Sequence, residues 1–496
     1  MGTSSSLSIL KSNRFFLNPK LNISKEMVTL PNQSSLSFET CSSSDDIDAD
    51  SPQMTLKQHG AVVFITGANE SKRFLFEAAR RVGLDIVVID SEESAGRRLE
   101  SLGVVDRFLP VDLDSEVSKA ASQCYSLIRS LDVPVRGVVT FMEMSVLLSS
   151  MVAELCGLPG LSPASVSIAR DKRLTREATR TAGLASPAAF LIKTASDVAP
   201  ASAHVGFPAV LKPIIGADSL GVKRVDNLAE LLEAFSEASR VMNSAVISAG
   251  FLTAVDVTSA VDAPSVLPVE FLLEEYLDGP EVDIDLLLHN GQCFYSAVSD
   301  NGQTVEPYFT ETYGNLPSVL PARDQAALTQ LAVDATSALG LDMGVFHVEA
   351  KLTSRGPRLI EINARLGGGP ICEMHRRVAG IDLAYEQVRL CVGLGPSFKA
   401  PGSHPAKSAF AYMTTNAISS GTVGGCLDFL KRHDCTKMFC RVKPGDKVVG
   451  PKEGQPTWLT EIWMEAESPS ETSNLVKEIC HMSDLVAAEF ANSYVH

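Results

Sequence analysis

Two segments in the second half of the chain alternate apolar and polar residues, and this pattern constrains the fold more than any other feature. The segments are Val345-Phe346-His347-Val348-Glu349 and Leu359-Ile360-Glu361-Ile362-Asn363-Ala364-Arg365. Such alternation is typical of half-buried strands, because successive side chains of a strand point to opposite faces of the sheet. Residues 354–357 between the two segments contain Gly and Pro and would form a turn, so the sequence predicts a β-hairpin.

The polar face of this hairpin would carry a distinctive set of side chains. Glu361, Asn363 and Arg365 would share it, with Glu349 beside them on the neighbouring strand. Two carboxylates and an amide are oxygen ligands that suit Mg²⁺ when the ion is shared with substrate phosphates. An arginine beside them could hold a phosphoryl or carboxylate group through two hydrogen bonds. The alternative is an amphipathic hairpin with a solvated polar face.

A second set of residues indicates an anion site. Lys212 ends a short apolar run that leads into a loop with Gly216, Ser219 and Gly221. Glycine allows positive φ and close approach, so the N–H groups of this loop could surround an anion to which Lys212 adds charge. The spacing is not the Walker pattern, and an ordinary hairpin turn would explain the glycines equally well. Lys172 lies upstream on a predicted helix, where a solvated helix face is the alternative.

A third segment, 271–279, would form an apolar strand that ends in acids and a turn, as a hinge between two subdomains would. Its last strand residues are Glu274, Glu275, Tyr276 and Leu277. Further along, Asn301-Gly302 is typical of a hairpin turn, although Asp300 and Asn301 could instead shape a substrate pocket.

Taken in order, these motifs resemble the ATP-grasp superfamily over roughly residues 160 to 395. Within it the chain is most similar to the ligase half of the carnosine synthases and to bacterial L-amino acid ligases. The segments that carry this likeness are 273–279, 282–285, 298–302, 309–312, 344–349 and 356–363. The chain lacks the extra amino-terminal half of a carnosine synthase, and Ala364 stands where that enzyme has a proline before the arginine.

The resemblance implies an α/β ATP-grasp fold with a preceding parallel α/β lobe and a small C-terminal lobe. It implies ATP with Mg²⁺, or Mn²⁺, as cofactors. The implied activity is that of an ADP-forming ligase, which joins the carboxylate of one amino acid to the amine of another through an acyl phosphate. Two other functions remain open. One is a carboxylase-like or nucleotide-pathway ligase with the same fold, and the other is a nucleotide-binding regulatory protein without turnover.

The resemblance also implies roles for individual residues. The metal ligands would be Glu349, Glu361 and Asn363. The nucleotide would be bound by Lys172, Lys212, Gly216, Ser219, Gly221, Glu274, Glu275, Tyr276, Leu277 and Glu281. The catalytic residues would be Arg365 and Lys212. The amino acid substrates would contact Glu311, His347, Arg365 and Gly368. For His347 a structural role is an equally open alternative.

Composition excludes some functions. The net charge of −16 argues against a nucleic-acid binder, which needs a basic surface. None of the ten cysteines forms a Cys-x-x-Cys pair, which favours reduced, structural thiols. No apolar run approaches the length of about 18 residues that a membrane span requires. Symmetry considerations favour a homodimer.

The chain should divide into several lobes, because 496 residues are too many for one core. We expect a tail at 1–57, a parallel α/β lobe at 58–158, an ATP-grasp domain at 159–395 and a C-terminal lobe at 396–496. The ATP-grasp domain would comprise subdomains 159–268 and 270–395, with a flexible insertion at 241–268. The tail is rich in serine and poor in acids in its first part. It would be the transit peptide of a plastid or mitochondrial protein, or the disordered tail of a cytoplasmic one.

Overall fold

The computed structural model describes most of the chain. The described residues are 60–69, 72–113, 115–216, 219–247, 252–254, 270–398, 404–425, 427–433, 435–452 and 456–494. The predicted tail at 1–57 and most of the predicted insertion at 241–268 lie outside them. Among the helices of the described part, none combines the length and the apolar character that a membrane span needs.

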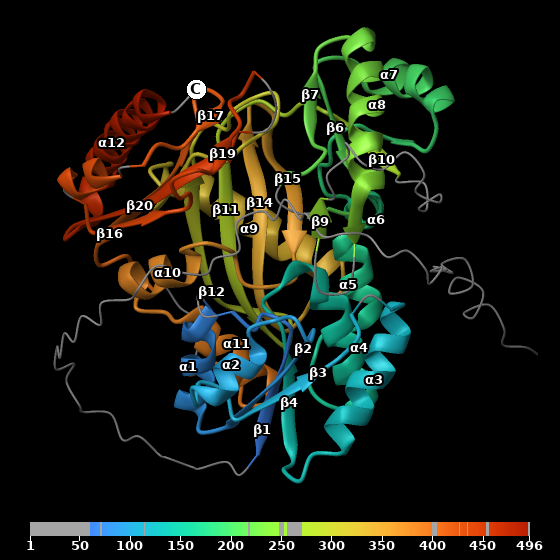
Figure 1. Ribbon diagram of the computed structural model, residues 1–496. Coiled ribbons are helices and arrows are strands. Elements are labelled where there is room, and N and C mark those ends of the chain that lie inside the picture. Colours follow the sequence, from blue (N-terminus) through green and yellow to red (C-terminus); the bar gives the residue numbers. More distant parts are fainter. Residues whose placement is uncertain are drawn as a thin grey trace, which may run out of the picture.

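The N-terminal part of the chain forms a parallel sheet flanked by helices, drawn in blue and cyan in Figure 1. The strand order is β3-β2-β1-β4, and every neighbouring pair is parallel. Strand β1 is buried along its whole length, as expected for a parallel sheet covered on both faces. The predicted parallel α/β lobe is therefore confirmed. Its elements are β1 (Ala61–Ile65), α1 (Arg73–Val82), β2 (Asp85–Asp90), α2 (Gly96–Ser101), β3 (Arg107–Pro110), α3 (Val117–Arg129), β4 (Val135–Val139) and α4 (Val146–Cys156).

The next part of the chain is built on a four-stranded antiparallel sheet with the order β5-β10-β6-β7. Helices α7 and α8 pack on this sheet and enclose an apolar core with it, at the upper right of Figure 1. The elements are α5 (Pro163–Arg170), α6 (Lys172–Thr181), β5 (Ala189–Ile192), α7 (Val198–Val205), β6 (Ala209–Pro213), β7 (Lys223–Val225), α8 (Leu228–Ser244), β8 (Ala245–Ile247), β9 (Leu252–Ala254) and β10 (Phe271–Glu275).

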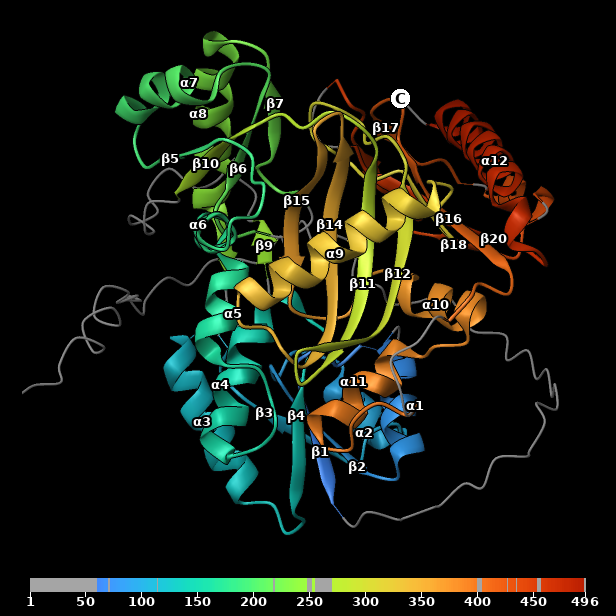
Figure 2. The same ribbon diagram turned by 180° about the vertical axis from the view of Figure 1, so that it is seen from behind.

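An eight-stranded antiparallel sheet forms the centre of the molecule, with the order β15-β14-β11-β12-β13-β16-β20-β18. Helix α9 crosses one face of this sheet, as Figure 2 shows, and α12 packs on the C-terminal strands. The elements are β11 (Glu281–His289), β12 (Gln292–Asn301), β13 (Tyr313–Leu316), α9 (Ala322–Ala338), β14 (Gly344–Thr353), β15 (Gly356–Asn363), α10 (Ile371–Ala379), α11 (Leu383–Cys391), β16 (Ala409–Asn416), β17 (Gly421–Thr422), β18 (Lys437–Cys440), β19 (Lys447–Val448), β20 (Trp458–Ala466) and α12 (Thr472–Ser493).

The C-terminal strands extend this sheet. Strand β13 pairs with β16, which continues through β20 to β18. The C-terminal part of the chain is thus joined by backbone hydrogen bonds to the sheet that carries the predicted hairpin. Only β17 and β19 form a separate small pair among the C-terminal strands of the described residues.

The predicted hairpin is confirmed, because β14 and β15 pair with each other in antiparallel register. The predicted turn at Asn301-Gly302 is wrong. Strand β12 ends at Asn301, and the loop 302–312 precedes β13. A Cβ at Gly302 would lie 2.4 Å from Thr312 Oγ1, so close packing explains the glycine there.

The N-terminal lobe and the central sheet share one apolar core. Helix α11 packs against α1, β4 and β14, and its Leu383, Ala384 and Val388 are fully buried with residues of the parallel sheet. Because α11 contacts both β4 and β14, this packing sets the position of the residues after Val139 relative to the hairpin.

Candidate active site

Three neighbouring strands of the central sheet bring polar side chains together on one face. Strand β14 lies between β11 and β15, and the register aligns their residues in rows. The rows are Asp283–Glu349–Glu361 and Asp285–His347–Asn363. The residues expected on the hairpin therefore lie together, and two aspartates of β11 join them.

Glu349 and Glu361 are the central pair of this face. Burial raises the pKa of Glu349 well above its ordinary range, and the charges of Glu361 and Asp283 raise it further. Burial also acts to raise the pKa of Glu361, but Lys172 outweighs it and holds that pKa below its ordinary value. Asn363 Nδ2 donates a hydrogen bond of 3.1 Å to Glu349 Oε1. The pKa of Glu349 is thus raised and that of Glu361 lowered, although the two carboxylates lie on adjacent strands.

Lys172 reaches this pair from the start of helix α6. Its Nζ lies 2.5 Å from Glu361 Oε2. Asp171 caps the helix by accepting a hydrogen bond of 2.9 Å from the backbone N–H of Leu174, which fixes where the helix begins. The backbone N–H of Lys172 also bonds to the carbonyl of Ile214, so the helix start is tied to the segment that follows β6.

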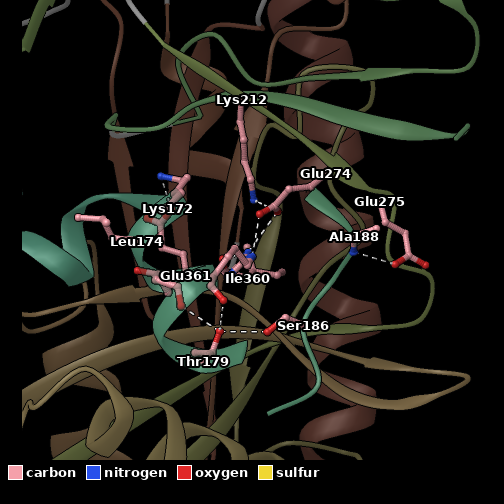
Figure 3. A network of polar contacts seen from close by, with 12 residues as sticks. Lys172, Leu174, Thr179, Ser186, Ala188, Lys212, Glu274, Glu275, Ile360 and Glu361 are labelled. Atoms are coloured by element: carbon pink, nitrogen blue, oxygen red, sulfur yellow. Dashed lines mark hydrogen bonds and ion pairs between the residues drawn. The ribbon is translucent and has the colours of Figure 1, made fainter. Parts of the chain in front are cut away.

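Lys212 on β6 belongs to a buried ion-pair cluster, seen in Figure 3. Its Nζ pairs with Glu274 of β10, and Arg176 Nε lies 2.7 Å from the same carboxylate. Burial acts to raise the pKa of Glu274, but Arg176 and Lys212 lower it to about 2. Arg176 also donates a hydrogen bond of 2.6 Å to the carbonyl of Ile360, so the cluster joins α6 to the hairpin.

The residues of the predicted hinge make protein contacts of their own. Glu275 accepts a hydrogen bond from the backbone N–H of Ala188 and pairs with Arg355. The Tyr276 hydroxyl donates to Glu306 Oε1 at 2.8 Å.

Leu277 of the predicted hinge and Glu281 at the start of β11 both lie close to Lys351 on β14. Its ammonium donates to the carbonyl of Leu277 and lies 3.7 Å from Glu281 Oε2. The side chain of Glu274 points into the ion-pair cluster described above and pairs there with Lys212.

The glycine loop connects β6 to β7. Gly221 has a φ of +76°, a conformation that favours glycine, and Ser219 has a φ of +55°. A Cβ at Gly216 would meet only ordinary contacts. The loop lies directly beyond Lys212, as the sequence indicated, and residues 217 and 218 lie outside the described part.

Arg365 follows β15 and is held from two sides. Its Nη2 donates to Asn363 Oδ1 at 3.3 Å, and its Nε lies 3.0 Å from Glu143 Oε2. Glu143 comes from the segment after β4 in the N-terminal lobe, and it also lies 3.7 Å from Arg170 Nε. Gly368 lies in the exposed loop before α10, with open space where a Cβ would be.

His347 lies in a buried polar network. Its Nδ1 is 2.9 Å from Asp285 Oδ1, and His375 Nε2 is 2.8 Å from the other oxygen of the same aspartate. The Tyr295 hydroxyl and His375 Nδ1 are 2.7 Å apart. A Cβ at Gly367 would lie 2.8 Å from His347 Nδ1, so the glycine lets the backbone approach the imidazole.

Glu311 lies beside strand β16, whose Tyr412 is also acted on by the charges of Asp283 and Asp285. It is exposed at the end of the loop before β13, and its carbonyl accepts a hydrogen bond from Asn416 of β16. Its charge acts on Tyr412 of the same strand and helps to raise the pKa of that phenol, after the larger effect of burial. The structure thus places Glu311 next to the C-terminal strands.

The donor set fits a divalent cation shared with a nucleotide. Glu349 and Glu361 present carboxylate oxygens opposite each other on adjacent strands. Asn363 adds an amide beside them. Among the described residues there is no group of three or more His, Cys, Asp or Glu side chains that could hold a metal ion by themselves. An ion here would therefore depend on phosphate oxygens or water for its remaining ligands.

Several residues of this region were not predicted from the sequence. Arg176 lies one helical turn after Lys172, a spacing that places both on one side of the helix. Asp283 and Asp285 alternate with apolar residues, as the hairpin residues do. The helical spacing of Arg176 and the strand alternation of Asp283 and Asp285 could both have been read from neighbouring residues in the sequence. No such local pattern points to Glu143, because its partner Arg365 is more than 200 positions away.

Comparisons with known proteins agree with this architecture. Residues 205–373 match the model of the ATP-grasp domain, and residues 76–160 match that of the ATP-grasp N-terminal domain. Carnosine synthase 1 from Gallus gallus is 34% identical over 347 residues, which cover 68% of this chain and 35% of that protein. The alanine–anticapsin ligase from Bacillus subtilis strain 168 is 29% identical over 257 residues, covering 50% of this chain and 52% of that protein.

Among solved structures, an L-amino acid ligase from Bacillus licheniformis superposes with a TM-score of 0.69 at 23% identity. The match covers 86% of this chain and 98% of that structure. By contrast, the chain spans well under half the length of the carnosine synthases it matches. The order of the elements, the two matched domain models and this superposition all agree. The chain belongs to the ATP-grasp superfamily.

Proposed function

We propose that this protein is an ADP-forming ligase that joins the carboxylate of one amino acid to the amine of another, with ATP and Mg²⁺. The observation that carries the proposal is the polar face on β14 and β15. There Glu349 and Glu361 lie opposite each other, with Lys172 on one side and Arg365 on the other. The similarity to a carnosine synthase and to an alanine–anticapsin ligase supports amino acids as substrates.

The reaction would proceed in two steps. A carboxylate oxygen of the donor attacks the γ-phosphorus of ATP, the bond from that phosphorus to the bridging oxygen breaks, and ADP leaves. The amine nitrogen of the acceptor then attacks the carbonyl carbon of the acyl phosphate and gives up a proton. Collapse of the tetrahedral intermediate breaks the bond from carbon to the phosphate oxygen, and inorganic phosphate leaves.

The residues of the site suit this chemistry because phosphoryl transfer depends mainly on positioning and on charge neutralisation. Glu349, Glu361 and Asn363 would hold Mg²⁺, which neutralises charge on the transferring phosphates when bound. Lys172 and Lys212 would contact the phosphates. Both ammonium groups are paired with carboxylates in this structure, so each would exchange or share its partner when nucleotide binds.

Water must be kept from the acyl phosphate, and the glycine loop 216–221 would cover the phosphates for this purpose. The hinge at 274–277 would receive the adenine, and Glu281 the ribose. Arg365 would stabilise the negative charge of the tetrahedral intermediate. Its ion pair with Glu143 holds the guanidinium beside Asn363. Glu311, His347 and Gly368 would contact the amino acids.

The test is ADP release by the full chain with Mg²⁺ and ATP across a matrix of amino acid and amine pairs. Release that requires two particular amino acids, with a condensed product found by mass spectrometry, would establish the proposal and name the substrates. Release with bicarbonate or another carboxylate alone would assign the protein to a carboxylase-like or nucleotide-pathway reaction. Nucleotide binding without release under any condition would indicate a regulatory protein. Light scattering on the same sample tests the expected homodimer.

A further inference from the structure

The loop 302–312 between β12 and β13 touches the four-stranded subdomain at several points. The backbone N–H of Arg224 on β7 donates a hydrogen bond of 2.9 Å to the carbonyl of Pro307. Ser219 of the glycine loop lies within 3.5 Å of the carbonyl of Phe309. Paired backbone hydrogen bonds between Val305 and Thr310 close the loop on itself. The loop therefore meets the subdomain as a defined unit.

Glu306 is the residue of this loop with the most specific contacts. Its Oε2 lies 2.5 Å from Arg224 Nη1, and its Oε1 accepts the hydrogen bond from the Tyr276 hydroxyl at 2.8 Å. The Arg224 guanidinium also lies over the Tyr276 ring, 4.6 Å from its centroid. Glu306 and Arg224 are both largely covered, with side chains 27% and 30% exposed. Each carboxylate oxygen thus has its own donor, from a different segment.

These contacts link three segments to which the proposed function gives separate tasks. Arg224 lies on the strand that the glycine loop enters, and Tyr276 belongs to the hinge. The third segment is the loop itself, which ends at Glu311, a proposed substrate contact. An isolated ion pair of this exposure contributes little stability. The Glu306 carboxylate makes both of its contacts only when Arg224, Tyr276 and the loop lie together. These contacts therefore stabilise that arrangement relative to others.

We propose that Glu306 is a positioning residue that couples nucleotide binding at the hinge to the order of the loop that carries Glu311. The inference rests on the proposed function, because it requires that the hinge bind ATP. Nucleotide that holds the hinge and the glycine loop in place would hold Arg224 and Tyr276 against Glu306, and so stabilise the loop. By linkage, an amino acid that orders the loop would tighten nucleotide binding by the same factor.

The test uses hydrogen exchange of peptides that cover residues 303–312, with and without a saturating non-hydrolysable ATP analogue and Mg²⁺. In the wild-type chain we expect the nucleotide to slow exchange of this loop about fivefold or more, the lower end of typical coupling between sites. In Glu306→Gln, which keeps the size and the acceptor for Tyr276 but loses the charge opposite Arg224, most of this protection should disappear. The variant should still bind the analogue, as measured by calorimetry.

A matched control is Glu270→Gln. Glu270 is 29% exposed and pairs with Lys193 at 2.7 Å, within the four-stranded subdomain and away from the loop. This variant should keep the wild-type protection. If Glu306→Gln does not fold, Arg224→Gln tests the same ion pair from the other side.

The possible results separate the two proposals. Equal protection in Glu306→Gln and wild type, at saturating analogue, would overturn the coupling. So would analogue binding to the wild-type chain without any protection of the loop, while the proposed ligase function would stand. If the wild-type chain did not bind the analogue at all, both proposals would fall.

Discussion

Glu349 and Glu361 lie opposite each other on adjacent strands, and Lys172 pairs with only one of them. The pKa of Glu361 is held low by this lysine, whereas burial and the charge of Glu361 raise the pKa of Glu349 well above its range. Two carboxylates this close repel each other, so the one that lacks the lysine holds its proton more readily. Of the two proposed metal ligands, Glu361 therefore keeps its negative charge to lower pH.

The first prediction concerns the metal. Glu361→Gln removes the charge that Lys172 balances and one proposed ligand, so ADP release that depends on both amino acids should fall by about 100-fold or more. The Mg²⁺ concentration needed for half-maximal rate should rise. Initial rates over a Mg²⁺ titration measure both.

Glu465→Gln is the matched control, because Glu465 belongs to the same sheet, pairs with Arg377 and has a comparable exposure of 28% against 22% for Glu361. It should leave the Mg²⁺ dependence unchanged. Wild-type rates in Glu361→Gln would contradict its role as a metal ligand.

The second prediction concerns the buried cluster around Glu274. Arg176→Met removes a guanidinium that is 3% exposed and bonded to both Glu274 and the carbonyl of Ile360. Breaking a buried ion pair from one side leaves polar groups without partners, which typically costs about 3–5 kcal/mol. Urea unfolding measures the loss of stability.

The control for that prediction lies on the same helix. Arg173 is 39% exposed and pairs with Glu177 one turn away, so Arg173→Met should cost less than about 1 kcal/mol. Similar losses in the two variants would show that the cluster contributes nothing beyond a surface ion pair.

The third prediction is a dependence of stability on pH. Arg176 and Lys212 overcome the effect of burial and lower the pKa of Glu274 from 4.5 to about 2. A carboxyl whose pKa is lower in the folded state stabilises the fold above its unfolded pKa. That contribution is lost as pH falls from about 4.5 towards 2, because the unfolded chain then binds more protons.

Comparison with a variant isolates this contribution. Between pH 6 and pH 3 the wild-type melting temperature should fall more steeply than that of Glu274→Gln, which has no proton to bind at this position. Parallel curves for the two proteins would show that Glu274 does not titrate differently on folding.

The fourth prediction concerns the contribution of the N-terminal lobe. Glu143 lies 3.0 Å from Arg365 and holds its guanidinium beside Asn363. With Glu143→Gln the arginine should lose its fixed position, and misplacement of a catalytic group by about 1 Å can cost about 100-fold in rate. We expect kcat to fall by more than nucleotide affinity, since the hinge and the glycine loop are untouched and Glu143 acts on Lys172 through its charge alone.

Steady-state kinetics and calorimetry with ADP measure the two quantities. Glu154→Gln on the exposed side of α4 in the same lobe serves as the control and should behave as wild type. A fall in nucleotide affinity of the same size as the fall in kcat would argue that Glu143 only stabilises the fold.

Local patterns in the sequence were sufficient to predict the two strands of the hairpin and the side chains on its polar face. Alternation placed Glu349, Glu361 and Asn363 on one side of a hairpin, and the structure pairs those strands in that way. The spacing of four residues could also have placed Arg176 on the same side of its helix as Lys172. The turn at Asn301-Gly302 failed because a two-residue signal says nothing of the loop's packing, and Gly302 is required by its contact with Thr312.

The sequence by itself determined which side chains share a face of a strand or helix, because that depends only on the period of the backbone. The tertiary structure decided which of these faces meet. It placed β11 beside β14, so that Asp283 and Asp285 joined the site, and it brought Glu143 to Arg365 across the boundary between two lobes. Such meetings depend on strand order and on packing between elements distant in the chain, for which a local period carries no information.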